Sequence, residues 1–485
     1  MALGLSRLII LTGIAAPMAL ATSSASAHAF GTRYDLPIPL GIYLTGAGVA
    51  VFLSFMVMAR FLKRRGELQG GFQFDILSLP GMRWLGSALL RNALGSLSIV
   101  IFGLVLTTGF LGNADPLKNF TPTFVWIVWW VGMAYISALF GNFWSLVNPW
   151  SILFIWFSKL AGDPRPMFSY PSRLGHWPAV GLLFIFAWIE LVFEKGEHPQ
   201  VLATLIVIYS VLTWVGMGMF GRDTWLKHGE IFTAVFNLLS RFAPTVGREG
   251  QWHLRPPAAG LIDYRPSSLS AVCFVLLLLT TVTYDGVLQT PMWSGLLDKA
   301  IDSQSQSGSM IANWNSGISP ITLTKTIALV TVPCIFVAVY GVFCHAVAMF
   351  GSSGRVPTRD IAGYFVLSLV PIAIAYHLSH YLSYLLITGQ QIIPLASDPF
   401  GRGWDLLGTA DYKLDIGILN AKIVWYVAVI AIVIGHVIAV YLSHITALWV
   451  FEDRHAALRS QIPMLVLMIG YTMISLWILS QPIVN

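Results

Sequence analysis

Charged residues are scarce in this sequence. Asp, Glu, Lys and Arg make up 10% of its 485 residues, whereas a soluble domain carries roughly a quarter. Hydrophobic residues make up 56%, and no polar stretch is long enough to build a sizeable soluble domain. The scarcity of charge excludes a soluble globular protein and indicates an integral membrane protein.

Cysteine and several catalytic motifs are also rare or missing. The three cysteines, Cys273, Cys334 and Cys344, all fall inside apolar runs and form no CxxC pair, which excludes a disulfide scaffold and a zinc knuckle. The chain has no GxxxxGK[ST] loop, no GxSxG elbow and no HExxH helix. These absences argue against nucleotide hydrolysis, a serine hydrolase and a standard metalloprotease.

The first 27 residues have the form of a cleavable secretory signal peptide. Arg7 precedes a short apolar core, and Ala25, Ser26 and Ala27 form a small-residue peptidase site. An uncleaved first helix is the alternative, which the shortness of the apolar core disfavours. Cleavage after Ala27 makes His28 the mature N-terminus, and residues 28–485 then form a single transmembrane domain.

Apolar runs of about 20 residues predict an all-α, polytopic transmembrane helix bundle with about ten spans after the signal. The predicted spans lie near 40–62, 93–112, 122–141, 177–194, 200–220, 267–288, 322–350, 361–388, 423–449 and 462–482. Two shorter apolar stretches, 145–160 and 230–242, predict interfacial or re-entrant helices, because Pro149 interrupts the first and both are too short to cross.

Basic residues predict the orientation of these spans, since Lys and Arg stay on the cytoplasmic side. With the mature N-terminus outside, 19 of the 28 basic residues fall in the inner loops. We therefore expect a bacterial inner-membrane protein with both mature termini in the periplasm. The formal charge of +6 is then a topology signal, and it gives no reason to invoke nucleic acid as a partner.

Two of the expected periplasmic loops, 289–321 and 389–422, are much longer than the others. Long irregular loops in compact proteins are often functional. The second contains SDPFGRGWDLLGTADYKLD, which is rich in Asp and Gly. Two interpretations stay open: a solvated connector, or a lid or docking surface for periplasmic protein partners.

Ionisable side chains within the spans are functional candidates, because a bilayer makes them costly. At a rise of about 1.5 Å per residue, Glu190, Asp285, His377 and His380 all fall in the outer half of their spans. Four ionisable side chains from three helices are therefore expected at one level, in the periplasmic leaflet.

The segment AYHLSHYLSYLL (375–386) places His377 and His380 one turn apart on one helix face. Tyr381, Tyr384 and Thr388 continue this face outward. Lipid cannot satisfy the hydrogen bonds of such a polar stripe, so the stripe must point into the bundle.

Two imidazoles and a carboxylate are a plausible ligand set for zinc, copper or iron. The sequence thus predicts a metal and catalytic site of His377, His380 and Asp285, with Glu190 as a weaker further ligand. The alternative is that these side chains hydrogen-bond the helices together. Gly286 either allows close approach of a neighbouring backbone or loosens the helix end.

Other histidines suggest further cofactor sites. His436 and His345, with His444, give a loose version of the histidines that a haem-binding electron-transfer anchor needs. A lone His436 in IVIGHVIAV is also typical of a packing histidine. If cleavage exposes His28, its free amine and imidazole could chelate copper, although any residue can follow a cleavage site.

Five strings in the chain stand out: HAFGTRYDLPIPL (28–40), FWSLVNPW (143–150), TYDGV (283–287), HLSHYLSYLLITGQ (377–390) and SDPFGRGWDLLGTADY (397–412). Together they resemble a family of bacterial multi-pass membrane proteins labelled fenitrothion hydrolase. The resemblance covers nearly the whole mature chain. It implies hydrolysis of an organophosphorus triester, and it supplies no residue roles.

Two classes of function follow. In the first, a metal held by the predicted site activates water and hydrolyses a small apolar ester that arrives through the lipid. In the second, the protein is non-enzymatic: a permease, or a membrane subunit that docks periplasmic partners. The haem or metal electron-transfer anchor is a third alternative.

Overall fold

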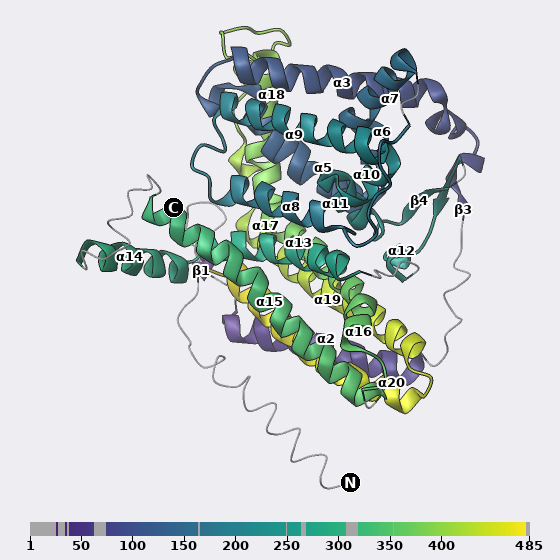
Figure 1. Ribbon diagram of the computed structural model, residues 1–485. Coiled ribbons are helices and arrows are strands. Elements are labelled where there is room, and N and C mark those ends of the chain that lie inside the picture. The colour runs from purple at the N-terminus through teal and green to yellow at the C-terminus, as the bar shows by residue number, and fades with distance from the viewer. Residues whose placement is uncertain are drawn as a thin grey trace.

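Long apolar helices dominate the computed structural model of the chain (Figure 1). The structure describes residues 26–27, 34–35, 38–62, 74–162, 165–248, 250–262, 268–306, 319–352 and 354–481. Within these ranges nine helices are long and apolar enough to cross a bilayer. This confirms the predicted all-α polytopic bundle and indicates association with lipid.

Six of the nine spans are each one complete helix, and a seventh, Pro320–Gly351, covers all but the last residue of α15. They are α2 (Leu40–Phe61), α3 (Ala88–Leu111), α9 (Pro199–Phe220), α13 (Leu269–Leu288), α15 (Pro320–Ser352), α19 (Ala421–Val450) and α20 (Arg454–Leu479). Two spans are composite: α4 (Phe120–Pro122), the π-helix η5 (Thr123–Val131) and α5 (Gly132–Phe140) form one, and α16 (Thr358–Phe365), η6 (Val366–Leu369) and α17 (Val370–Leu386) form the other.

Local chemistry sets where these helices begin and why polar residues are tolerated inside them. The Ser268 hydroxyl accepts a hydrogen bond from the Ala271 amide at 3.3 Å and caps α13, which satisfies a first-turn N–H. Inside α13, the Thr280 hydroxyl donates to the Leu276 carbonyl at 2.9 Å. Such bonds within one helix satisfy the hydroxyls without water.

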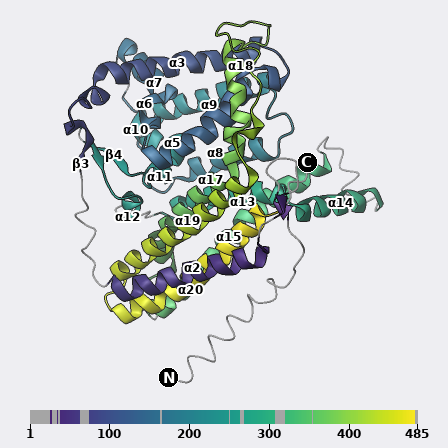
Figure 2. The same ribbon diagram turned by 180° about the vertical axis from the view of Figure 1, so that it is seen from behind.

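The helices form two groups that meet along α13 and α17 (Figures 1 and 2). One group contains α2, α15, α19 and α20, which pack on one another, and α17 packs on α19. The other contains α3, α9 and the α4–η5–α5 span, together with most of the shorter helices. Helix α13 contacts α8 (Trp177–Leu191), α15 and α17, so residues on α13 and α17 lie at the junction of the two groups.

Shorter helices complete the bundle. They are α6 (Trp144–Val147), α7 (Pro149–Ala161), α8 (Trp177–Leu191), α10 (Arg222–His228), α11 (Ile231–Ser240), α12 (Ala259–Ile262), α14 (Pro291–Gln306) and α18 (Ile392–Ser397). Helix α8 corrects one expectation: the predicted full span 177–194 is a 15-residue helix, about 22 Å long. It ends at Leu191 because Val192, with φ −122° and ψ −38°, leaves the helical conformation after its amide makes the last helical bond, to the Trp188 carbonyl.

Helix α11 and the α6–α7 pair replace the two predicted half-inserted segments. Pro149 follows a break at Asn148, whose side chain accepts a hydrogen bond from the Ser151 amide at 3.1 Å and caps α7. Seven of the ten residues of α11 are buried. Helix α11 is therefore packed inside the bundle and does not lie on its surface.

Strands are few in the part of the chain that the structure describes. Strands β3 (Phe74–Asp75), β5 (Gln251–Leu254) and β4 (Thr245–Arg248) form a small antiparallel sheet in that order, and β1 (Ser26–Ala27) pairs with β2 (Tyr34–Asp35). Except for β1, the predicted signal peptide lies outside the described residues, and so does His28.

Candidate functional site

A large cavity lies where the last turns of α8, α13 and α17 meet the first turns of α15 and α19. Its volume is about 990 Å³. We call this end of the bundle the Asp285 end. The residues around the cavity entrance include Glu194 and Glu197, both exposed in the turn between α8 and α9. The cavity therefore opens at the Asp285 end, which the basic residues predict to be periplasmic.

Asp285, His380 and Tyr381 form a hydrogen-bonded group in the wall of this cavity. The Nε2 atom of His380 lies 3.0 Å from Oδ2 of Asp285, and the Tyr381 hydroxyl donates to the same oxygen at 2.6 Å. The side chains of His380 and Asp285 are 8% and 14% exposed. Helix α17 thus supplies two adjacent donors for one nearly buried carboxylate on α13.

His377 lies one turn deeper and does not join this hydrogen-bonded group. It lines a separate cavity of about 30 Å³ together with Glu190 and Tyr381, which is room for about one water molecule. Its Nε2 atom is buried and has no hydrogen-bond partner. Its ring packs against Tyr381 at 4.7 Å and Tyr135 at 5.7 Å between centroids.

The polar stripe points into the bundle, as its spacing predicts. Tyr381, Tyr384 and Thr388 line the large cavity, and His377 lies beneath them in the small one. Glu190 on α8 lines both cavities. The four ionisable residues predicted to share one level therefore do meet around two adjoining cavities.

These residues do not form a metal-ligand group as they stand. Among the described residues, no three His, Cys, Asp or Glu side chains are placed so that they could hold one metal ion. His380 and Asp285 are paired with each other, while His377 and Glu190 face the smaller cavity. The predicted zinc, copper or iron site at His377, His380, Asp285 and Glu190 thus stays a prediction.

The histidines considered as cofactor ligands lie in different surroundings. His436 is fully buried in α19, where its Nδ1 lies 2.8 Å from the Ile432 carbonyl and its Nε2 has no partner. His345 is exposed on α15, with Nδ1 3.2 Å from the Thr358 hydroxyl. Counted from the Asp285 end, it lies ten residues further along its helix than His436, or about 15 Å. This difference in depth disfavours a haem held between them.

The large cavity carries an excess of negative charge. Its lining contains four carboxylates, those of Glu190, Glu194, Glu197 and Asp285, but one lysine, Lys325. Aromatic rings form much of the remaining wall, among them Trp126, Phe193, Tyr384 and Trp425. The sequence drew attention to Glu190 and Asp285, but it gave no signal that Trp126 from the π-helix and Trp425 from α19 would meet beside them.

A second, apolar cavity of about 500 Å³ lies next to the first. Trp126 and Ile189 line both cavities. The apolar cavity is lined by a cluster of aromatic side chains from η5, α7 and α11, including Trp129, Trp150 and Phe232. A single wall therefore separates an apolar space from the acidic one.

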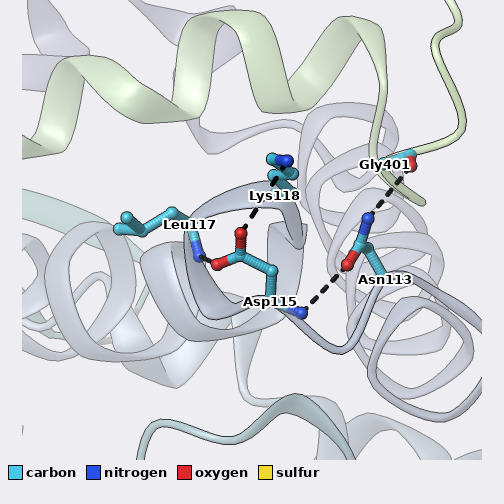
Figure 3. A network of polar contacts seen from close by, with 5 residues as sticks. All are labelled: Asn113, Asp115, Leu117, Lys118 and Gly401. Atoms are coloured by element: carbon cyan, nitrogen blue, oxygen red, sulfur yellow. Dashed lines mark hydrogen bonds and ion pairs between the residues drawn. The ribbon is translucent and has the colours of Figure 1, made fainter.

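The long segment 389–422 is fastened to the rest of the protein at several points (Figure 3). The Asn113 side chain donates to the Gly401 carbonyl at 3.3 Å, and the Asn113 amide donates to the Phe400 carbonyl at 2.8 Å. The Asn113 side chain in turn accepts from the Asp115 amide at 2.9 Å. These bonds hold residues 399–401 against the connection between α3 and α4.

The same segment is also organised internally. The side-chain oxygen of Gln390 accepts hydrogen bonds from the Tyr412 hydroxyl and the Asp415 amide, both at 2.9 Å. Ser397 donates to Asp405 at 2.7 Å, and this bond, with one from the Ala410 amide, lowers the pKa of Asp405 below its ordinary value. Segment 389–422 is therefore ordered by its own hydrogen bonds, although most of residues 401–420 are exposed. Both interpretations of the segment, a solvated connector and a docking surface, stay predictions.

The other long loop, 289–321, begins as helix α14 and is not irregular throughout. Trp293 of α14 is buried against Tyr284, with ring centroids 6.0 Å apart. Residues 307–318 lie outside the described part of the chain. Figure 1 shows α14 projecting sideways from the bundle at the Asp285 end.

Together these elements define a polytopic membrane protein with an acidic, aromatic cavity at one end of its helix bundle. Comparison of the chain with family models, curated proteins and solved structures finds no match in any of the three. The function is therefore inferred from the site itself.

Proposed function

We propose that the protein is a permease that binds small organic cations in the large cavity and takes them up from the periplasmic side. The observation that carries this proposal is the excess of carboxylates, four against one lysine, around a cavity within the bundle. Carboxylates inside a membrane protein typically face water-filled cavities and mark ion or substrate pathways.

The aromatic wall supports an organic cation over a hydrated metal ion. Trp126, Tyr384 and Trp425 line the same space as the carboxylates, and aromatic faces attract quaternary ammonium groups by cation–π interaction. A volume of about 990 Å³ is at the upper end of the usual range for small-molecule sites. The cavity thus has both the charge and the surface that such a ligand requires.

Choline and its uncharged isostere 3,3-dimethyl-1-butanol test this function directly. The purified protein should bind choline and be stabilised by it against heat, while the isostere, which has the same shape, should have little effect. Reconstituted liposomes should then accumulate labelled choline. Equal binding of the two compounds would show that charge does not select the ligand and would exclude the proposal.

The second candidate is hydrolysis of an organophosphorus ester, which the family resemblance implies. The 3.0 Å contact between His380 and Asp285 is the arrangement in which a carboxylate orients an imidazole that acts as a general base on water. The apolar cavity, which shares Trp126 and Ile189 with the acidic one, would admit an apolar ester from the lipid. The predicted metal at His377, His380 and Asp285 would strengthen this chemistry.

Electrostatics favours uptake over hydrolysis. Attack on a phosphotriester develops negative charge on the phosphoryl oxygens, and enzymes stabilise it with cations or hydrogen-bond donors. The cavity instead surrounds Asp285 with Glu190, Glu194 and Glu197. Three results together would favour hydrolysis over uptake. The wild type would release nitrophenolate from a nitrophenyl phosphotriester, it would contain bound metal, and His380→Asn would lose the activity.

The membrane orientation is part of the proposal. The distribution of basic residues supports an inner-membrane protein with both mature termini in the periplasm. Fusion of a periplasm-active reporter after residue 481 tests it, because the reporter should be active there and inactive when inserted between α15 and α16. In this orientation segment 389–422 also offers a folded surface to periplasmic partners.

A further inference from the structure

Another cavity, of about 330 Å³, lies at the end of the bundle opposite Asp285. It is formed by α10, α11, the residue before α8 and the first turns of α13. Its polar lining consists of His176, Asp223, Lys227, Thr233, Asn237 and Arg241. The rest of the lining is apolar: Leu226, Ala234, Leu238, Ala271, Phe274 and Val275.

The polar side of this cavity carries an excess of positive charge. Asp223 is already paired, because Arg222 Nη2 lies 2.6 Å from its carboxylate. The lining thus holds two basic side chains, Lys227 and Arg241, against the single carboxylate of Asp223. The sign is opposite to that of the cavity at the Asp285 end, so a different ligand class is required here.

His176, which lines this cavity, and its ring neighbour His228 both have unsatisfied nitrogens. The Nδ1 atoms of His176 and His228 are both buried without a hydrogen-bond partner, and the two rings pack edge to face with centroids 4.7 Å apart. Burial, the neighbouring His228 and the charge of Lys227 lower the pKa of His176 to about 4. A neutral imidazole still offers one N–H donor, and buried polar groups in proteins nearly always have a partner.

We propose that this cavity binds the phosphate headgroup of an anionic phospholipid. Lys227 and Arg241 would hold the phosphate oxygens, and His176 would donate a hydrogen bond. The apolar residues of α11 and α13, such as Leu238 and Phe274, would contact the adjoining acyl chain. Basic pockets between helices near the cytoplasmic surface bind lipid headgroups in this way, and this end is the one that the sequence predicts to be cytoplasmic.

The apolar part of the lining favours a phospholipid over inorganic phosphate as the ligand. Inorganic phosphate would use only the polar residues, whereas a phospholipid also covers Ala271, Phe274 and Val275 at the start of α13. The site lies at the opposite end of α13 from Asp285 and does not depend on the proposed cation uptake. Failure of either proposal therefore leaves the other unaffected.

The test uses the full-length protein in a neutral detergent. Phosphatidylglycerol, phosphatidylcholine and inorganic phosphate are added separately, and the apparent melting temperature and the bound lipid are measured. Phosphatidylglycerol should bind and raise the melting temperature, and the other two should have little effect. Each basic residue near the membrane surface typically adds about fivefold to the affinity for anionic lipid.

Variants distinguish the site from general attraction of anionic lipid to a basic surface. Lys227→Gln/Arg241→Gln should weaken phosphatidylglycerol binding by about 25-fold, two factors of about five. The control Arg355→Gln/Arg359→Gln removes two exposed basic residues before and at the start of α16, at the same end, and should leave binding unchanged. Lys227→Glu provides a second variant, should loss of Arg241 impair folding.

Three outcomes would overturn the assignment. Equal binding of phosphatidylglycerol and phosphatidylcholine, which share the phosphate and differ in net charge, would show that the cavity does not select an anionic headgroup. An equal effect of inorganic phosphate would show that the apolar wall contributes nothing. Equal losses in the Lys227 and Arg355 variants would place the lipid on the general surface and not in this cavity.

Discussion

His380 on α17 and Asp285 on α13 are joined by a 3.0 Å contact in the wall of an acidic cavity. The two residues are 95 positions apart in the chain, and their helices belong to the junction between the two helix groups. The same contact therefore joins the two helices at this junction and holds a charged side chain of the cavity in place.

Replacement of Asp285 by Asn should weaken choline binding by about tenfold or more. The substitution keeps the size of the side chain but removes its negative charge, and hydrogen bonds or contacts to a charged group contribute about 1.5–3 kcal/mol. Isothermal titration of purified protein with choline measures the change. Asp298→Asn, on the exposed surface of α14, is the matched control and should bind choline as the wild type does.

Replacement of Tyr381 by Phe should destabilise the protein by about 1–3 kcal/mol. The ring is retained, but the 2.6 Å hydrogen bond to Asp285 is lost and a nearly buried carboxylate keeps one donor fewer. Thermal unfolding in detergent, followed by tryptophan fluorescence, measures the difference. Tyr384→Phe removes another hydroxyl from the same cavity and should change the midpoint much less; equal shifts would mean that the bond to Asp285 has no special weight.

Replacement of Gly286, the residue after Asp285, by Ala should destabilise the protein through a steric clash. A methyl group at position 286 would lie 2.2 Å from the hydroxyl oxygen of Tyr376 and 2.9 Å from a methyl group of Ile478. Tyr376 is fully buried, so it cannot move without displacing its neighbours. We expect a loss of about 1–3 kcal/mol, typical of overpacking.

The control for this variant is Gly470→Ala in α20. Nothing lies within 4 Å of a methyl group there, and alanine favours a helix over glycine by about 1 kcal/mol. This control should be neutral or slightly stabilising. Similar destabilisation of both variants would show that helix flexibility, and not the contact with Tyr376, determines the effect.

Much of this arrangement could be predicted from the sequence because it depends on distance along a helix. Counting residues from the ends of the spans placed Asp285, His380 and Glu190 at one level, and the structure brings them to one cavity. The three-residue spacing of His377 and His380 also predicted that both imidazoles would face the bundle.

What the sequence could not supply is the rotation of each helix about its axis and the packing between helices. These decide that His380, and not His377, meets Asp285, and that Tyr376 instead of a neighbouring backbone fills the space beside Gly286. The same limit applies to α8. Hydropathy extends its apolar run to residue 194, but the turn at Val192 ends the helix three residues earlier.

Replacement of Gly401 by Ala should release segment 389–422 from the α3–α4 connection. Gly401 has a φ of +65°, and a methyl group there would lie 2.4 Å from the Lys118 carbonyl oxygen. The contacts of Asn113 shown in Figure 3 would then be lost. Faster tryptic cleavage at Arg402 or Lys413 would report the release.

Gly403→Ala separates the clash from backbone strain. Gly403 has a similar φ of +82°, but nothing lies within 4 Å of a methyl group at that position. This variant should therefore lose about 1–2 kcal/mol of stability, because alanine is strained in the left-handed conformation. Segment 389–422 should stay in contact with the α3–α4 connection. If both variants are cleaved equally fast, the contact with Lys118 does not hold the segment in place.

The histidine pair at the opposite end should make the protein less stable in mild acid. Burial, His228 and Lys227 lower the pKa of His176 to about 4 from its ordinary value of 6.5, and burial also lowers the pKa of His228. Between these values the unfolded chain binds protons that the folded protein does not. Stability should therefore fall as the pH decreases from 6.5 towards 4.

Apparent melting temperatures measured between pH 7.5 and 5 test this dependence. His176→Gln removes one titrating imidazole, so its melting temperature should fall less steeply with acid than that of the wild type. His455→Gln, at an exposed position, should follow the wild type. A His176→Gln curve parallel to the wild type would mean that the acid sensitivity arises elsewhere, since a group that binds protons only when unfolded must contribute to the slope.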